Sequence, residues 1–244
     1  MPRQRSGYPT TRVRDSRVRG FSDGHLDQTR WYVPPVAAYL KPTAPIAPDA
    51  VLPSDPGHAL LLAQELLEVP LMSNHAYGLW GYHGETDAGR PLTIQATGIG
   101  GPSAAIVLRE LADLGVRRAI RVGACTPLDG ELSPGEVIVV ERATVAGGGP
   151  AGEADRTLAG RLVEAAGTPV RTGPVASVDP VRAGTEPSPA DALATDLESA
   201  AVLSLAPALG VAGAAVLVAG TPSEEAVKRL GRSASVALAC AAEG

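Results

Sequence analysis

The chain has 244 residues, with a hydrophobic fraction of 45% and a formal net charge of −5. This length is enough for one large domain with a substantial core, and the acidic balance argues against nucleic acid as the main partner. Cys125 and Cys240 are too few for a disulfide framework, and no apolar run is long enough to span a membrane. We therefore expect a soluble cytoplasmic protein with no membrane partner.

The first 30 residues are polar and rich in arginine, and they contain few apolar side chains. We predict a basic, flexible N-terminal tail over residues 1–30 and a single folded domain over residues 31–244. A basic tail can bind nucleic acid, but a solvated extension fits the acidic body better.

Short apolar runs alternate with helical patterns along the rest of the chain. We predict strands at residues 50–52, 79–84, 91–96, 119–122, 136–141, 170–178 and 212–219. We predict one helix that begins at Ser54-Asp55-Pro56 and four further helices over 102–114, 155–166, 197–209 and 223–242. We also predict a flexible linker at 146–150 and a loop at 179–195. This alternation predicts an α/β fold with a mainly parallel or mixed sheet.

Residues 91–123 predict a strand, a glycine turn, a helix and a second strand. The turn at 97–101 holds three glycines, and Pro102 suits the first position of a helix. The two strands of such a unit run parallel with a right-handed crossover. Arg121 in the second strand is therefore expected to face the crevice where open α/β sheets bind ligands. The alternative is a buried ion pair between Arg121 and Glu198 or Asp196.

Five segments share their order and spacing with one known family. They read SDPGHA (54–59), NHAYGLWGY (74–82), TGIGGPS (97–103), IRVG (120–123) and DLESAA (196–201). They resemble the nucleoside phosphorylase family, of the purine nucleoside phosphorylase and uridine phosphorylase type, over about residues 39–242. The resemblance implies a single-domain, three-layer α/β/α fold with a central mixed sheet, assembled as a homodimer or as a hexamer built from dimers. It also implies cleavage of a nucleoside N-glycosidic bond with phosphate and without a cofactor or metal.

The resemblance assigns substrate-binding roles to retained and neighbouring positions. Arg121 would meet phosphate, since guanidinium groups bind phosphate through charge-assisted hydrogen bonds. Glu198 would hold the sugar hydroxyls, with Leu197 under the sugar and Asp196 in place of the family's first glutamate. For Glu198 the alternative is a carboxylate that stabilises a helix N-terminus. Cys125 would lie at the pocket floor, where packing is a safer interpretation than a nucleophile without an evident partner.

Several positions depart from the family pattern at the phosphate site. Ser54 and His58 stand where the family has the glycine and arginine of a GDPxR turn. Tyr77 replaces an arginine of an NxxR segment, and Ala124 replaces a serine or threonine. These changes remove two of the family's three phosphate-binding arginines, so we predict an eroded phosphate site.

His58 and Tyr77 each keep more than one interpretation. His58 could be a solvated residue of a first helical turn, a weaker anion contact or a general acid/base, and we name it as the candidate catalytic residue. Tyr77 could line an aromatic pocket wall or pack at a subunit interface.

The first functional hypothesis is an enzyme that acts on the N-glycosidic bond of a nucleoside-like small molecule, with ordinary phosphorolysis disfavoured. The reaction would then be hydrolysis, or glycosyl transfer to an acceptor other than phosphate. The alternative is a repurposed or inactive family member that binds a nucleoside-like or other small ligand, for example in specialised biosynthesis. A third hypothesis, a nucleic-acid-associated protein that uses the arginine tail, predicts salt-sensitive binding that depends on residues 1–30.

Overall fold

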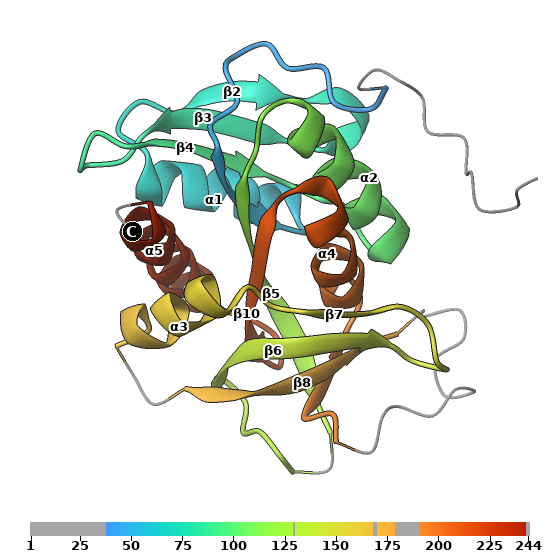
Figure 1. Ribbon diagram of the computed structural model, residues 1–244. Helices are drawn as coiled ribbons and strands as arrows, with labels where there is room; N and C mark the ends of the chain where they lie inside the picture. Colours follow the sequence, from blue (N-terminus) through green and yellow to red (C-terminus); the bar gives the residue numbers. More distant parts are fainter. Residues whose placement is uncertain (1–37, 129, 168–169, 179–190, 243–244) are drawn as a thin grey trace, which may run out of the picture. The chain divides into compact units, whose positions relative to one another are not determined.

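The computed structural model describes residues 38–128, 130–167, 170–178 and 191–242 (Figure 1). The predicted tail at 1–30 and most of the predicted loop at 179–195 lie outside these residues.

One mixed sheet forms the centre of the described chain (Figure 1). Its strands are β1 (Asp49–Pro53), β2 (Leu71–Asn74), β3 (Gly81–Glu85), β4 (Pro91–Gln95), β5 (Arg118–Pro127), β6 (Val137–Val145), β7 (Ala151–Glu153), β8 (Arg171–Ser177), β9 (Ala194–Asp196) and β10 (Ala212–Ala219). The order along the sheet is β10-β6-β8-β9-β5-β1-β4-β3-β2, and β10 also pairs with β5. These pairings close β5, β10, β6, β8 and β9 into a ring, from which β1, β4, β3 and β2 extend.

Helices cover both faces of this sheet (Figure 1). On one face lie α1 (Pro56–Leu66), α3 (Arg156–Ala165) and α5 (Glu224–Ala241), and α5 packs against both of the others. On the other face lie α2 (Gly101–Asp113) and α4 (Ser199–Leu205), which pack together, and a 3₁₀ turn (Pro207–Leu209) follows α4. The predicted three-layer α/β/α architecture is confirmed.

The predicted strand–helix–strand unit is present as β4, α2 and β5. The two strands are parallel as predicted, but they are not neighbours, because β1 lies between them and pairs in parallel with both. The helix α2 begins at Gly101, directly after Gly100, whose positive φ of 86° suits a residue without a side chain. The helix α1 begins as predicted, with Asp55 as its N-cap, where the side chain accepts hydrogen bonds from the N–H groups of Gly57 and His58.

Three predicted boundaries are wrong. β5 runs past residue 122 to Pro127, because its carboxyl half pairs with β10 and β9, so Arg121 lies in the strand interior and not at its end. The predicted linker at 146–150 is a turn between two antiparallel strands, with the N–H of Val145 bonded to the carbonyl of Pro150. The predicted helix at 197–209 begins only at Ser199 and is interrupted before Pro207.

The core lies between the sheet and its two helical layers. Its largest fully buried side chains include Leu52, Ile94, Ile120 and Leu217 on the strands and Leu62 on α1. None of the helices in the described residues combines the length and the apolarity that a membrane span requires.

Candidate functional site

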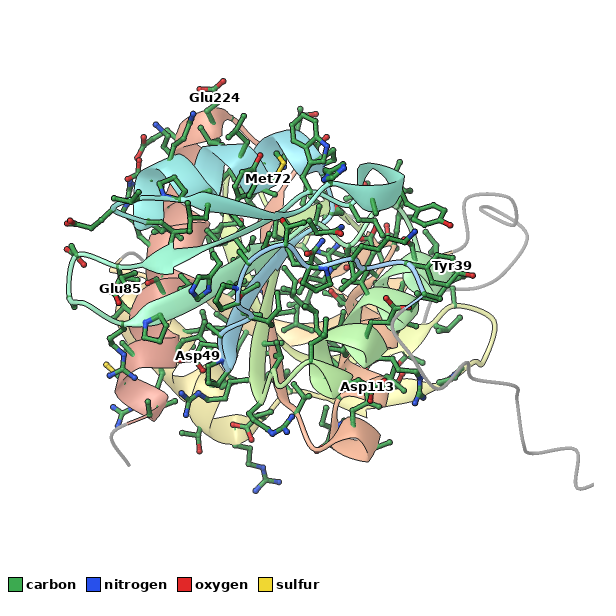
Figure 2. The ribbon with its side chains drawn as sticks, turned by 90° about the horizontal axis from the view of Figure 1, so that it is seen from above. Tyr39, Asp49, Met72, Glu85, Asp113 and Glu224 are labelled. Carbon is green, nitrogen blue, oxygen red and sulfur yellow. The ribbon has the colours of Figure 1, made fainter. Side chains whose placement is uncertain are left out.

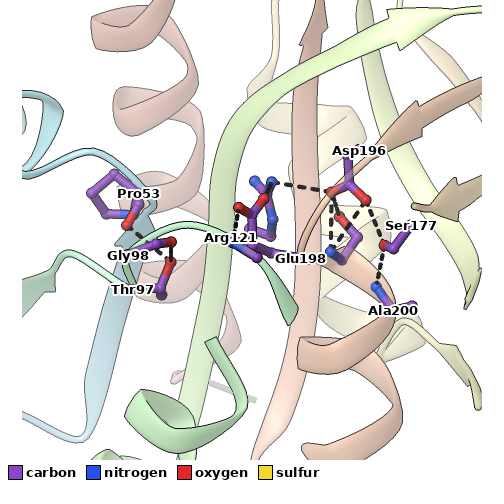
Figure 3. A network of polar contacts seen from close by, with 10 residues as sticks. Pro53, Thr97, Gly98, Arg121, Ser177, Asp196, Glu198 and Ala200 are labelled. Atoms are coloured by element: carbon purple, nitrogen blue, oxygen red, sulfur yellow. Dashed lines mark hydrogen bonds and ion pairs between the residues drawn. The ribbon is translucent and has the colours of Figure 1, made fainter. Parts of the chain in front are cut away.

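The carboxyl ends of four parallel strands, β1, β4, β5 and β10, meet at one edge of the sheet. The N–H of Gly98 donates to the carbonyl of Ser54 over 3.1 Å, which joins the ends of β4 and β1. The N–H of Gly220 donates to the carbonyl of Cys125 over 2.8 Å, which joins the ends of β10 and β5. Thr97 adds a side-chain contact to the carbonyl of Pro53 (Figure 3). This edge is where open α/β sheets bind ligands.

Arg121, Asp196 and Glu198 form a buried cluster beside this edge, which we call the acid–arginine cluster (Figure 3). Nη2 of Arg121 lies 3.1 Å from Oδ2 of Asp196 and also pairs with Oε2 of Glu198. The three side chains are at most 5% exposed. The ion pair that the sequence offered as the alternative for Arg121 is therefore present, and it combines both acids.

Asp196 is held from several sides. Its carboxylate accepts hydrogen bonds from the hydroxyls of Ser177 and Ser199, each at 2.5 Å, and from the N–H of Ser199. Ser177 also accepts from the N–H of Ala200 over 2.8 Å (Figure 3). These bonds fix the end of β9 to β8 and to the start of α4. Ser177 and Ser199 are not among the site residues predicted from the sequence; the position of Ser177 at the end of an apolar strand is the sequence signal that points to it.

Glu198 joins the starts of two helices. It lies at the N-cap of α4 but makes no cap bond there. Its Oε1 instead accepts from the N–H of Gly100, just before α2, over 2.8 Å. The interpretation of Glu198 as a carboxylate near a helix N-terminus therefore holds for α2 as well as α4, and the same carboxylate neutralises Arg121.

Arg121 keeps hydrogen-bonding capacity that the described residues do not use. Its Nε and Nη1 are buried and have no hydrogen-bond partner among the described residues. A buried N–H without a partner costs about 1–3 kcal/mol. Gly123 makes room for the guanidinium, because a Cβ atom there would lie 2.1 Å from Nη1.

A cavity of about 420 Å³ opens next to the acid–arginine cluster. Among the described residues it is lined by Ile99, Gly100, Gly101, Pro102, Val145, Ser177, Val178, Leu197 and Ala201. Gly100 and Ser177 both line the cavity and hydrogen-bond an acid of the cluster, and Leu197 lies between the two acids in sequence. The cavity is large enough for a small molecule. Its wall is mostly apolar, with the cluster directly behind it.

Cys125 follows Arg121 on β5 and is buried. Burial raises its pKa to about 12; the nearby Asp196 adds to the rise and Arg121 opposes it. Because the thiolate is the reactive form, Cys125 is a poor nucleophile at neutral pH. The structure favours the packing interpretation of this residue.

Three further predicted positions lie apart from the cluster contacts. His58 is half buried in the first turn of α1, and no hydrogen bond or ion pair between described residues joins it to Arg121 or Glu198. Ala124 is half buried on β5, opposite Val218 of β10. Ser54 contributes its backbone carbonyl to the strand ends.

Tyr77 lies in a short 3₁₀ turn, Ala76–Gly78, with a left-handed φ of 57° and 70% of its surface exposed. Its ring packs edge-on against Tyr39, with centroids 5.4 Å apart. The carboxylate of Glu110 on α2 holds residues 38–40 by accepting from their N–H groups. Tyr39 is at the outer edge of the molecule, on the side opposite Glu85 (Figure 2). Within the described chain, Tyr77 is therefore a surface residue.

A mixed sheet with helices on both faces is consistent with the nucleoside phosphorylase fold. A model of the phosphorylase superfamily matches residues 48–242, and the chain belongs to that family.

Curated relatives share part of the sequence. A DeoD-type purine nucleoside phosphorylase from Oceanobacillus iheyensis is 37% identical over 100 residues, which are 41% of this chain and 42% of that protein. Similar proteins of the same name come from Clostridium novyi, with 36% identity over 95 residues (38% of this chain and 40% of that protein), and from Streptococcus pyogenes, with 36% over 99 residues (40% and 41%). The chain thus spans about two-fifths of the length of the curated relatives that it matches.

Proposed function

We propose that this protein cleaves the N-glycosidic bond of a nucleoside-like small molecule in the cavity beside the acid–arginine cluster. Family membership supports the type of substrate. The observation that carries the proposal is that Gly100, Ser177 and Leu197 line the cavity and connect it to Glu198 and Asp196. In this proposal Glu198 accepts hydrogen bonds from sugar hydroxyls, and Leu197 packs under the sugar.

Glu198 has the capacity for this role although both of its oxygens are already engaged. Each carboxylate oxygen has two lone pairs, and the described contacts take one donor each, Gly100 at Oε1 and Arg121 at Oε2. Cleavage of an N-glycosidic bond builds positive charge on the sugar, and a buried carboxylate stabilises that charge.

We further propose that the reaction does not depend on phosphate. The guanidinium of Arg121 already pairs with two carboxylates, so a phosphate would have to compete with both of them. Loss of two charge-assisted contacts, at the positions of His58 and Tyr77, costs about 3–6 kcal/mol of binding. That loss weakens a dissociation constant by about 10²–10⁴-fold. Water is then the acceptor of the sugar, with a sugar hydroxyl or another alcohol as the variant of this reaction.

The same proposal includes the assembly and location that the family suggests. We propose a cytoplasmic homodimer, or a hexamer of such dimers, with Tyr39 and Tyr77 at the contact between subunits. Their exposure and edge-on packing support that placement. His58 stays a candidate acid or base in this proposal.

A non-catalytic binding role is the second candidate. It is favoured by the mutual neutralisation of Arg121 and Glu198, the two residues that the reaction would use. It predicts that nucleosides raise the melting temperature of the protein without being cleaved.

The test is incubation of the protein with a panel of purine and pyrimidine nucleosides, with and without phosphate, and measurement of free base by chromatography. The proposal predicts base release at the same rate in both conditions and a loss of at least about 100-fold in Glu198→Gln. Arg161→Ala on the surface of α3 is the matched control and should keep wild-type activity. Absence of base release in both conditions, together with thermal stabilisation by nucleosides, would establish the binding role instead.

A further inference from the structure

The described wall of the cavity contains no group that could protonate a departing base. The lining side chains are aliphatic, apart from proline, two glycines and Ser177, whose hydroxyl is bonded to Asp196. After β10 the chain continues with Gly220, Thr221 and Pro222, which also provide no acid. A neutral nucleobase is a poor leaving group unless its ring nitrogen is protonated as the bond breaks.

The cluster behind the wall has one positive and two negative side chains, Arg121 against Asp196 and Glu198. It is buried, so water screens this imbalance weakly. A positively charged ligand in the cavity would compensate the excess negative charge, and a neutral one would not.

Resting on the proposed function, we propose that the preferred substrates are ribosides whose base already carries a positive charge, such as an N-alkylated purine or pyridinium riboside. In this reaction the bond between C1′ and the ring nitrogen breaks, and its electron pair stays on the nitrogen. The base therefore leaves as a neutral molecule and needs no proton. A water oxygen bonds to C1′, and the proton of that water goes to solvent.

This specificity explains two features together. The apolar wall fits a flat, delocalised base and provides no acid, which such a base does not need. The negative cluster lies behind Gly100 and Leu197, which line the cavity. It stabilises the positive charge of the substrate while that charge moves from the base to the sugar. Glu198 thus acts both on the sugar hydroxyls and on the charge of the whole substrate.

The experiment compares 7-methylguanosine with guanosine at pH 6, where the base of the first is cationic and that of the second is neutral. Base release is measured in the wild type, in Glu198→Gln and in Glu164→Gln, after subtraction of the uncatalysed rate. Glu164 is an exposed acid on α3, so its variant changes the net charge equally but on the surface. Loss of the contact between Glu198 and the sugar affects both substrates alike, because they have the same sugar. The ratio of their kcat/KM values therefore reports only the effect of the charge of Glu198 on the charge of the base.

We expect the wild type to prefer 7-methylguanosine by at least about 100-fold. The preference should fall about tenfold in Glu198→Gln, the effect of one charge at short range inside a protein, and stay unchanged in Glu164→Gln. Equal cleavage of the two substrates, or an unchanged preference in Glu198→Gln, overturns this inference and leaves the proposed function standing. Release of base from neither substrate also overturns this inference, whereas the proposed function is overturned only by absence of base release from the whole nucleoside panel.

A second measurement uses the wild type alone and does not depend on the folding of a variant. Because the described cavity wall supplies no acid, the inference predicts that guanosine is protonated by the solvent, so its kcat/KM should rise about tenfold per unit as the pH falls from 7 to 5. The value for 7-methylguanosine should stay nearly constant from pH 6 to 5. A plateau or a bell-shaped profile for guanosine would show that the enzyme supplies an acid, and would overturn the inference.

Discussion

The N–H of Gly100 donates a hydrogen bond of 2.8 Å to Oε1 of Glu198, which lies 98 residues further along the chain. This bond joins the turn before α2 to the start of α4, and Glu198 then pairs with Arg121 on β5. Three segments that are distant in sequence therefore meet at one carboxylate.

Gly123→Ala should disrupt the site, because the new Cβ would lie 2.1 Å from Nη1 of Arg121. The guanidinium has to move or the strand has to bend, and overpacking of this kind costs about 1–3 kcal/mol. Denaturant unfolding measures the loss of stability. The matched change Gly160→Ala adds a Cβ with no atom within 4 Å in the helix α3, and it should stabilise by about 0.5–1 kcal/mol. Equal stability of the two variants would contradict this account of Gly123.

Ser177→Ala should destabilise the protein by about 1–3 kcal/mol, because it removes one buried hydrogen bond to Asp196 and leaves the N–H of Ala200 without the hydroxyl that accepts from it. The midpoint of urea unfolding measures this effect. Ser133→Ala removes an exposed hydroxyl and should change stability by less than about 0.5 kcal/mol. An unchanged urea midpoint for Ser177→Ala would contradict this prediction, because it would mean that water replaces the hydroxyl without a cost in stability.

Alkylation should distinguish the two cysteines. Burial and Asp196 raise the pKa of Cys125 to about 12, whereas Cys240 is exposed. Iodoacetamide at pH 8 should therefore modify Cys240 in the native protein and reach Cys125 only after unfolding. Peptide mass spectrometry reads the two sites separately, and rapid labelling of native Cys125 would be incompatible with the packing role.

The raised pKa of Cys125 also predicts a pH dependence of stability. The folded state holds the thiol proton more tightly than the unfolded state, whose pKa is near the ordinary value of 9.0. The contribution is complete below pH 9 and is lost as the pH rises from 9 towards 12. The difference in unfolding free energy between the wild type and Cys125→Ala should therefore shrink over that interval. A constant difference would contradict the assignment.

Much of the fold is predictable from the sequence, and particular residues show why. The glycine turn, Pro102 and the periodic apolar residues after it act locally, so the start of α2 is correctly predicted within a residue. β5 is longer than predicted because its carboxyl half is stabilised by pairing with β10 and β9, which are far away in sequence. β2, which was not predicted, is short and is defined by its pairing with β3.

For the candidate site too, local sequence segments predict some of the residues, and contacts between distant segments determine the others. Arg121, Asp196, Leu197 and Glu198 could be named from sequence segments, and the structure brings them together beside a cavity. The groups that donate hydrogen bonds to the two carboxylates could not be predicted from the sequence. Gly100 contributes only a backbone N–H to Glu198, and Ser177, which donates to Asp196, is one serine among many. The assignment of His58 and Tyr77 to the site stays a prediction, since neither contacts the cluster in the described chain.

The most direct test of the central claim is to identify the sugar product when a nucleoside is cleaved in the presence of excess phosphate. Phosphorus NMR detects ribose 1-phosphate, and a reducing-sugar assay detects free ribose. The neutralised Arg121 predicts free ribose in the same amount as the released base, with no new phosphate ester. Formation of ribose 1-phosphate in equal amount to the base would contradict the claim, because it would show that the site binds and uses phosphate.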